Sequence, residues 1–321
     1  MPRSRSFFLR LVCLVAFAAC CTLDVSAQLS LQVTVGQYRH MAYEPVSLNL
    51  RVRNDSGNPL SFRDGGTFSL QVRHNGKFIA SRLAKDKGKN PIHALTLPAG
   101  AEKSISLQIN RFAQLQRPGE YEVVVRVGHR RLRSDYRARP AVFSVSHGIE
   151  VWHRSVGVPR PNSAGEIASR RIAIVRFRGD HGDLNMLKIE DDQYVYAVSR
   201  LGPSIVGVTP QGEVDARSFV HTMVQTAPRQ FEYRTFDLAG KQKEVKVYLF
   251  EGTNPRLVRD PDLGRVIVLG GRLAVEGLDF NTAGEGPTPA GLDDAPGVGD
   301  VAQPDDTIIE DLPDMADRAK E

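Results

Sequence analysis

The sequence predicts an all-β fold built from antiparallel sheets. Between Leu29 and Val145, apolar residues alternate with polar ones at period two, as in strands that bury one face of a sheet. A second series of short apolar segments follows, and turn sequences rich in Gly, Pro and Asp separate them. The one helical candidate, Arg111–Gln116, is too short to change the class.

Residues 28–147 are expected to form a first domain. The alternation predicts strands at residues 29–35, 46–53, 68–73, 77–81, 105–109, 121–127 and 141–145. Asn75 and Gly76 tolerate positive φ, so they predict a tight hairpin between two of these strands. About seven strands in about 120 residues predict an immunoglobulin-like sandwich.

Residues 148–280 are expected to form a second antiparallel β domain, either a sandwich or a barrel, after a linker-like stretch at Val158–Gly165. Its strands are predicted at residues 171–178, 184–189, 194–201, 205–208, 219–225, 231–236, 244–250 and 265–269. Residues 281–321 are rich in Gly, Pro, Ala and Asp and predict a disordered acidic tail.

The N-terminus has the pattern of a signal peptide. Arg3, Arg5 and Arg10 flank an apolar run at Leu11–Leu23, and small residues lead to a cleavage site at Ala27. This run is shorter than the ~20 residues that cross a bilayer, so no transmembrane segment is predicted. We therefore expect an exported protein of the periplasm or the extracellular space, with or without association with the outer membrane.

All three cysteines, Cys13, Cys20 and Cys21, lie inside the predicted signal peptide. Cleavage at Ala27 leaves a chain without cysteine, which excludes disulfides, cysteine-ligated zinc, iron–sulfur clusters and thiol chemistry. Lipid attachment at Cys20 is the alternative processing route, because Ala18 and Ala19 precede that residue.

The net charge of +5 is a cancellation between regions. Residues 28–147 carry 19 basic and 8 acidic side chains, a net +11, whereas residues 281–321 carry 2 basic and 11 acidic ones, a net −9. Five arginines gather near the end of the first domain: Arg130, Arg131, Arg133, Arg137 and Arg139. Clustered arginine predicts a site for an anionic polymer or a protein partner, and a solvated charged loop is the alternative. A second hypothesis is that the acidic tail competes for this site.

No pattern in the chain names a reaction. The eight histidines form no zinc-protease motif, and neither a nucleophile elbow nor a phosphate-binding loop is present. Asp180, His181 and Asp183 form the densest polar cluster, which is either a weak metal or acid–base site or a hairpin turn. The acidic run at residues 190–192 is interpreted as a charged turn. We predict no cofactor, no nucleic-acid binding and no catalytic residue.

Several turn sequences of the first domain resemble a known family. They are Asn54, Ser56-Gly57, Pro59-Leu60 and Phe62, then Phe68, Val72 and Asn75-Gly76-Lys77, then Leu97-Pro98-Ala99-Gly100, and finally Pro118-Gly119-Glu120-Tyr121. Over residues 45–127, this pattern resembles bacterial immunoglobulin-like modules related to the intracellular proteinase inhibitors. The resemblance implies a β-sandwich fold and, as one possible activity, protease inhibition.

These observations favour a non-catalytic binding or structural protein of the cell envelope or secretome. The basic face of the first domain is its predicted binding surface. Two alternatives stay open: a proteinase-inhibitor-like module, and a hydrolytic enzyme that uses the loop Asp180–Asp183.

Overall fold

The computed structural model describes residues 28–79, 90–159, 167–275 and 277–279. The predicted signal peptide with Cys20 and Ala27, and the predicted acidic tail, lie outside the described residues. The chain divides into two compact units, residues 1–273 and 274–321, and both β regions belong to the first unit. No helix of the described residues is long and apolar enough to cross a membrane.

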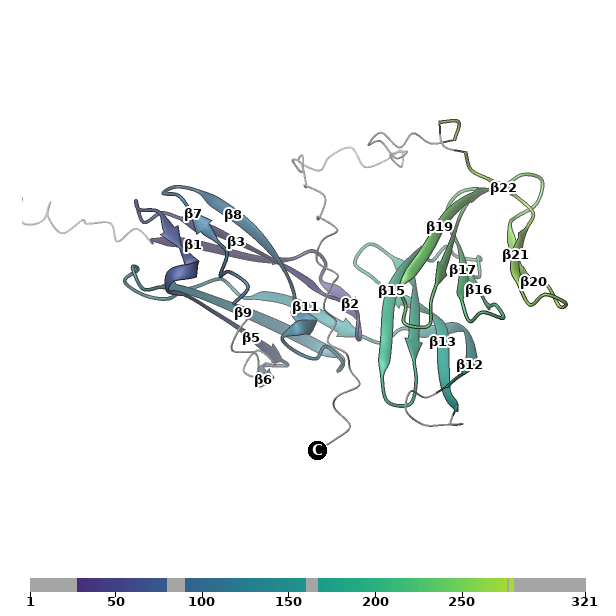
Figure 1. The fold of residues 1–321 in the computed structure, drawn as a ribbon, viewed down its shortest axis with the longest axis horizontal. Coiled ribbons are helices and arrows are strands. Elements are labelled where there is room, and N and C mark those ends of the chain that lie inside the picture. Colours follow the sequence, from purple (N-terminus) through teal and green to yellow (C-terminus); the bar gives the residue numbers. More distant parts are fainter. Residues whose placement is uncertain (1–27, 80–89, 160–166, 276, 280–321) are drawn as a thin grey trace, which may run out of the picture. The chain divides into compact units, whose positions relative to one another are not determined.

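The first β region is a sandwich of two sheets. A three-stranded sheet has the order β1-β3-β8, and a six-stranded sheet has the order β2-β11-β9-β5-β6 with β10 paired to β9 (Figure 1). The strands are β1 (Leu29–Val35), β2 (Arg39–Met41), β3 (Ser47–Asn54), β4 (Leu60–Ser61), β5 (Gly66–His74), β6 (Lys77–Ile79), β7 (Thr96–Leu97), β8 (Glu102–Gln108), β9 (Gly119–His129), β10 (Tyr136–Arg137) and β11 (Ala141–Ser146).

The order of these strands is that of an immunoglobulin-like sandwich. Neighbouring strands pair antiparallel except β2, which lies parallel to β11 at the edge of the six-stranded sheet. The predicted all-β class is therefore confirmed. The helical candidate Arg111–Gln116 was wrong, because the chain there forms only a short 3-10 turn, η3 (Ile109–Arg111), and then continues without a helix. A second such turn is η1 (Phe62–Asp64).

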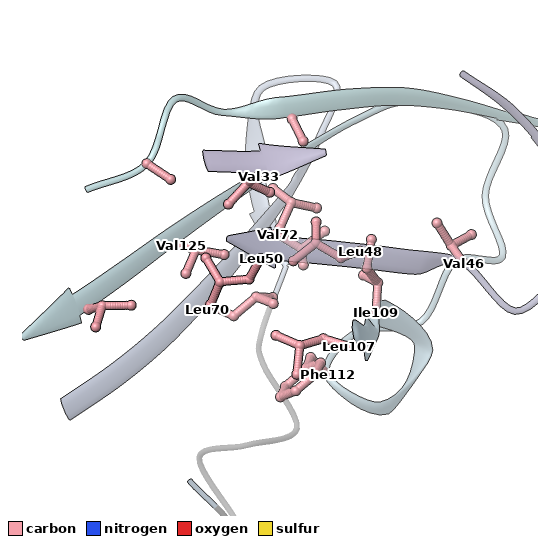
Figure 2. Packing of buried hydrophobic residues seen from close by; sticks show 14 of the residues in the cluster. Val33, Val46, Leu48, Leu50, Leu70, Val72, Leu107, Ile109, Phe112 and Val125 are labelled. Carbon is pink, nitrogen blue, oxygen red and sulfur yellow. The ribbon is translucent and has the colours of Figure 1, made fainter. Parts of the chain in front are cut away.

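Alternation along each strand builds the core between the two sheets. In β3, Leu48, Leu50 and Val52 are fully buried, whereas the polar residues between them are exposed. Figure 2 shows Leu50 facing Leu70 and Val125 of the opposite sheet. Burial of a side chain of this size stabilises a fold by about 1.5–3 kcal/mol, so this layer supplies much of the stability of the region.

Tyr121 fixes the turn that leads into β9. Its ring is 1% exposed and stacks on Phe143, and its hydroxyl donates a hydrogen bond of 2.9 Å to the carbonyl oxygen of Arg117. A tyrosine that bonds back to the backbone a few residues upstream is a hallmark of sandwiches of this type. The sequence Pro118-Gly119-Glu120-Tyr121 thus has a fold-level explanation.

Asn54 holds together two of the turns that carry the family resemblance. Its side chain is fully buried, and its amide nitrogen donates to the carbonyl oxygens of Asn58, Leu97 and Pro98 at 2.7–3.1 Å. Its amide oxygen accepts hydrogen bonds from the amide and hydroxyl groups of Ser56. These motif residues therefore organise corners of the sandwich.

The second β region contains a four-stranded sheet of order β12-β13-β14-β15 and a five-stranded sheet of order β16-β17-β18-β19-β22 (Figure 1). A separate hairpin pairs β20 with β21. The strands are β12 (Ile149–Pro159), β13 (Ile167–Arg178), β14 (Asp183–Glu190), β15 (Val195–Pro203), β16 (Gln211–Val214), β17 (Val220–Ala227), β18 (Gln230–Phe236), β19 (Gln242–Leu249), β20 (Arg256–Arg259), β21 (Val266–Leu269) and β22 (Arg272–Leu273).

Two sequence predictions for this region were wrong. The apolar segment 205–208 forms a turn in place of a strand, and Val206 is 99% exposed. Val158 and Pro159, which were assigned to a linker, end the long strand β12. The first prediction failed because the periodicity of a short apolar segment cannot distinguish a strand from a turn. The second failed because an edge strand such as β12 tolerates a proline, here Pro159.

The two larger sheets pack face to face. Ile172, Ile174 and Leu187 of one sheet meet Val224 and Phe236 of the other in a shared apolar cluster. Trp152 of β12 lies against Gly212 of β16, where a β-carbon would come within 2.6 Å of the indole. The far face of the five-stranded sheet is covered in part by the hairpin of β20 and β21, through a smaller cluster that includes Met223, Leu257 and Val268.

We predict that Tyr121→Phe lowers the free energy of unfolding by about 1 kcal/mol, because the ring stays in place while the hydrogen bond to the Arg117 carbonyl is lost. Urea denaturation of the full chain measures this change. The control is Tyr38→Phe at a side chain that is 47% exposed, where the expected change is close to zero. Equal stability of Tyr121→Phe and the unmodified chain would contradict the prediction.

Candidate functional site

The structure brings the five predicted arginines together on one hairpin. Arg130, Arg131 and Arg133 lie in the loop that follows β9, Arg137 belongs to β10, and Arg139 comes directly after it. All five residues are exposed.

A sixth exposed arginine extends this group. Arg126 of β9 lies directly opposite Arg137 of β10 in the antiparallel register, and opposite Ser69 of β5 on its other side. Residues that are directly opposite in such a pair project from the same face of the sheet, so the two guanidinium groups share a face. We call the six residues the basic hairpin surface: Arg126, Arg130, Arg131, Arg133, Arg137 and Arg139.

The loop of this hairpin is tied to its surroundings by hydrogen bonds. The ring of His129 is buried, accepts a hydrogen bond at Nδ1 from the amide of Arg131 and therefore donates from Nε2 to the carbonyl of Ser61. The amide of Arg133 donates to the side-chain oxygen of Gln28, whose own amide donates to the hydroxyl of Tyr136. The arginines thus extend from a backbone that is held in place.

Guanidinium groups of the basic hairpin surface form no ion pair within the part of the chain that the structure describes. Asp135 is the acidic residue of the hairpin loop. Elsewhere in the same region, three of the exposed arginines are paired: Arg51 with Glu102, Arg53 with Asp55 and Arg73 with Glu122. Like charges placed opposite each other destabilise a sheet, so the arrangement of Arg126 and Arg137 is not explained by folding.

The side chains of the candidate metal site, Asp180, His181 and Asp183, do not come together in the structure. The carboxylate of Asp180 accepts hydrogen bonds from the backbone amides of Tyr38, at 2.6 Å, and Arg39, at 2.9 Å. Asp183 pairs with Arg178 at 3.1 Å, and His181 is exposed. Across the described residues, no group of three or more His, Cys, Asp or Glu side chains is placed to hold a metal ion. Asp180 instead joins the second β region to β2 of the first.

Glu44 marks a buried polar contact that the sequence analysis missed. Its side chain is 6% exposed, and Oε1 accepts a hydrogen bond of 2.5 Å from Nε of Arg200. Oε2 accepts from the amide of Met41 at 2.8 Å and lies 3.6 Å from Nδ1 of His40. Burial raises the pKa of Glu44, but the hydrogen bonds with His40, Arg200 and Met41 outweigh it and hold the pKa below its usual value.

Apolar side chains surround this contact. Met41 of β2 is 4% exposed and packs in one cluster with Val175, Phe177, Met186 and Val198 of the four-stranded sheet. Glu44 and Arg200 are separated by 156 positions in the sequence, so no local pattern could have predicted the pair.

His221 is a buried histidine of β17. Its Nδ1 lies 2.7 Å from the hydroxyl of Tyr233, and its Nε2 lies 3.3 Å from Oδ2 of Asp215. Burial lowers the pKa of His221, more than Asp215 raises it, and burial also raises the pKa of Tyr233 to about 12. The buried imidazole thus hydrogen-bonds with the phenol of Tyr233 and lies near the carboxylate of Asp215.

Asp215 also borders a surface cavity of about 560 Å³. Its Oδ1 accepts hydrogen bonds from the amides of Arg217 and Phe219, so the carboxylate shapes the loop that lines the cavity. With Oδ2 directed to His221, both oxygens have partners inside the protein. This arrangement gives Asp215 a structural role in the loop.

No family model matches the chain, and no curated protein matches it. One similar solved structure is the alkylpurine DNA glycosylase AlkC of Pseudomonas fluorescens bound to DNA with an abasic site analog, at 16% identity and a TM-score of 0.26. This match covers 38% of the present chain, which spans 31% of the glycosylase chain. Another is a DUF4784 family protein of Bacteroides caccae, at 5% identity and a TM-score of 0.16, covering 74% and 84% of the two chains. Neither likeness supports a fold or a function at these TM-scores.

We predict that Asp180→Ala accelerates hydrogen exchange at the amides of Tyr38 and Arg39 by about three- to tenfold, because both lose a charged acceptor. Exchange measured by NMR or mass spectrometry tests this. Asp183→Ala is the matched control, since that carboxylate pairs with Arg178 and should leave both amides unchanged. Similar exchange in the two variants would refute the assignment.

We also predict that Glu44→Gln destabilises the chain by roughly 1–3 kcal/mol at pH 7, because a charged hydrogen bond to Arg200 is lost. A carboxyl whose pKa is depressed by folding stabilises the fold above its unfolded pKa, which is near 4.5, and this stability is lost as the pH falls through the folded value. The difference between Glu44→Gln and the unmodified chain should therefore narrow below pH 4.5.

Urea denaturation at several pH values between 7 and 3 measures this difference. Glu102→Gln serves as the control, because the exposed pair with Arg51 should contribute less than about 1 kcal/mol. A difference for Glu44→Gln that stays constant down to pH 3 would show that ionisation of Glu44 does not stabilise the fold.

Proposed function

We propose that this chain is an exported, non-catalytic binding protein that engages a polyanionic partner through the basic hairpin surface. The observation that carries the proposal is the set of six exposed arginines on β9, β10 and their loop, none of them in an ion pair with a described residue. Unpaired guanidinium groups are free to bind phosphate, sulfate or carboxylate groups in a bidentate manner.

The surroundings of this surface favour binding over mere solubility. Like charges placed opposite each other weaken a sheet, and here Arg126 and Arg137 lie side by side in register, with Asp135 as the acidic residue of the loop. The hydrogen bonds of His129 and Gln28 hold the loop before any partner arrives. A surface ordered in advance loses less conformational entropy on binding.

The N-terminal sequence supports the exported location in this proposal. The pattern ending at Ala27 is that of a signal peptide, and the chain beyond it contains no cysteine. The partner is then a polyanion of the envelope or the external medium, with the acidic polysaccharides as its principal class. The geometry of the loop Asp180–Asp183 supports no hydrolytic role, since both carboxylates have structural partners.

The triple variant Arg131→Gln, Arg133→Gln, Arg137→Gln tests the proposal. We predict that it elutes from a heparin column at lower salt and binds heparin at least about tenfold more weakly at low ionic strength, because three unpaired charges are removed. Arg130 is left unchanged, since its side-chain carbons pack over Gly65 and a shorter side chain would lose part of this contact.

The control variant removes the same charge from paired arginines of the same region: Arg51→Gln, Arg53→Gln and Arg73→Gln. It should change heparin affinity by less than about threefold. An equal loss in both triple variants would show that net charge, and not the basic hairpin surface, governs binding. Absence of heparin binding by the unmodified chain would count against a polyanionic partner.

A further inference from the structure

A second feature of the surface lies at the turn between β14 and β15. Asp191 organises this turn: its Oδ1 accepts hydrogen bonds from the amides of Gln193 and Tyr194, at 2.9 and 2.8 Å. Its own amide donates to the carbonyl of Tyr194 at 2.9 Å. The acidic run predicted to be a charged turn is therefore a turn closed by its middle carboxylate.

Tyr196 is held on two sides. Its hydroxyl donates to Oδ2 of Asp191 at 2.5 Å, and the guanidinium carbon of Arg170 lies 3.6 Å from the centre of its ring. Arg170 is itself fixed, because its Nη1 donates to the carbonyl of Leu238 at 3.0 Å. One face of the ring is thus covered by a cation that the protein holds in place.

Both tyrosine rings remain open to solvent. Tyr194 is 57% exposed and Tyr196 is 38% exposed, although Arg170 covers part of the latter. Their ring centres are 6.4 Å apart and their planes meet at 63°. Since β15 is the edge strand of the four-stranded sheet, no strand among the described residues lies beyond them. We call the two residues the tyrosine platform.

The charges around the tyrosine platform are balanced. Burial raises the pKa of Asp191, but hydrogen bonds from Tyr196 and the turn amides outweigh it, so the carboxylate stays ionised beside Arg170. Burial and the neighbouring Asp191 raise the pKa of Tyr196, so the phenol stays protonated. Near the turn, Lys188 pairs with Glu190. The two cations that the described residues place here, Arg170 and Lys188, thus lie beside acidic groups.

We propose that the tyrosine platform is a binding site for a neutral saccharide. The exposed tyrosine rings offer apolar faces, against which the C–H face of a pyranose ring can pack, and the ring of Tyr196 is held by Asp191 and Arg170. The exposed Gln193 is adjacent to Tyr194 in the chain, and its side-chain amide and the hydroxyl of Tyr194 are groups that can exchange hydrogen bonds with sugar hydroxyls.

Other partners fit these observations less well. Single-stranded nucleic acid also stacks on aromatic rings, but it needs a basic groove for its phosphates, and the turn carries Glu190, Asp191 and Asp192. A protein partner needs a contiguous patch of several hundred Å², whereas the residues between the two tyrosines and before them are polar or half-buried. The neutral saccharide matches both the aromatic faces and the balanced charge.

The test titrates the full chain with cellohexaose and chitohexaose, two neutral oligosaccharides whose sugar rings have flat apolar faces, by calorimetry and NMR. We expect one or both to bind. Tyr194→Ala should weaken that binding about tenfold or more, while Tyr194→Phe, which keeps the ring, should weaken it less than about threefold. Because the Tyr194 ring is mostly exposed, Tyr194→Ala is expected to fold normally.

Phe78→Ala is the matched control, since that ring is 59% exposed on β6 and should not affect saccharide binding. The triple arginine variant should also retain it, which separates this proposal from polyanion binding. If neither oligosaccharide binds the unmodified chain, or if Tyr194→Ala binds as tightly, the proposal fails. If Tyr194→Ala misfolds, the test uses the unmodified chain, in which saccharide binding should shift the NMR resonances of the ring protons of both tyrosines. Ring resonances that do not shift during the titration would refute the proposal.

Discussion

Burial of one face of every strand, without any covalent cross-link, is the constraint on which the rest of this structure depends. The described residues contain no cysteine, so the sandwich is held by side chains such as Leu50, Leu70 and Val125 between its sheets. Because strand residues alternate strictly between faces, the inward positions of Val125 and Val127 force Arg126 outward. The basic hairpin surface is thus set by the same alternation that builds the core.

The contact around Glu44 shows how polar groups are accommodated beside an apolar cluster. Met41 packs on the four-stranded sheet, and Glu44 and Arg200 pair at the margin of this packing, where the side chain of Arg200 keeps 31% exposure. Removing one partner leaves the other charge without its hydrogen bond, which costs more than the pair itself contributes. Asp180 adds a second, more exposed link to the backbone of β2.

Several acidic residues of the second β region organise turns. Four aspartates accept hydrogen bonds from backbone amides two to four residues ahead in their own turns: Asp191, Asp215, Asp237 and Asp260. These carboxylates are thus used by the fold itself. At one of these turns, the same hydrogen bonds also position two tyrosines, which gives a structural turn a surface that can bind a ligand.

The sequence by itself determined the all-β class, most strands of the first region and the gathering of Arg130, Arg131 and Arg133, because period-two burial and local charge are encoded over a few neighbouring residues. Only the tertiary structure decided that Arg126 joins them, that Asp180 binds amides near Tyr38, and that Glu44 meets Arg200. It also decided that segment 205–208 is a turn and that Arg170 supports the ring of Tyr196. These outcomes depend on strand register and on contacts between residues far apart in the chain, which no local pattern specifies.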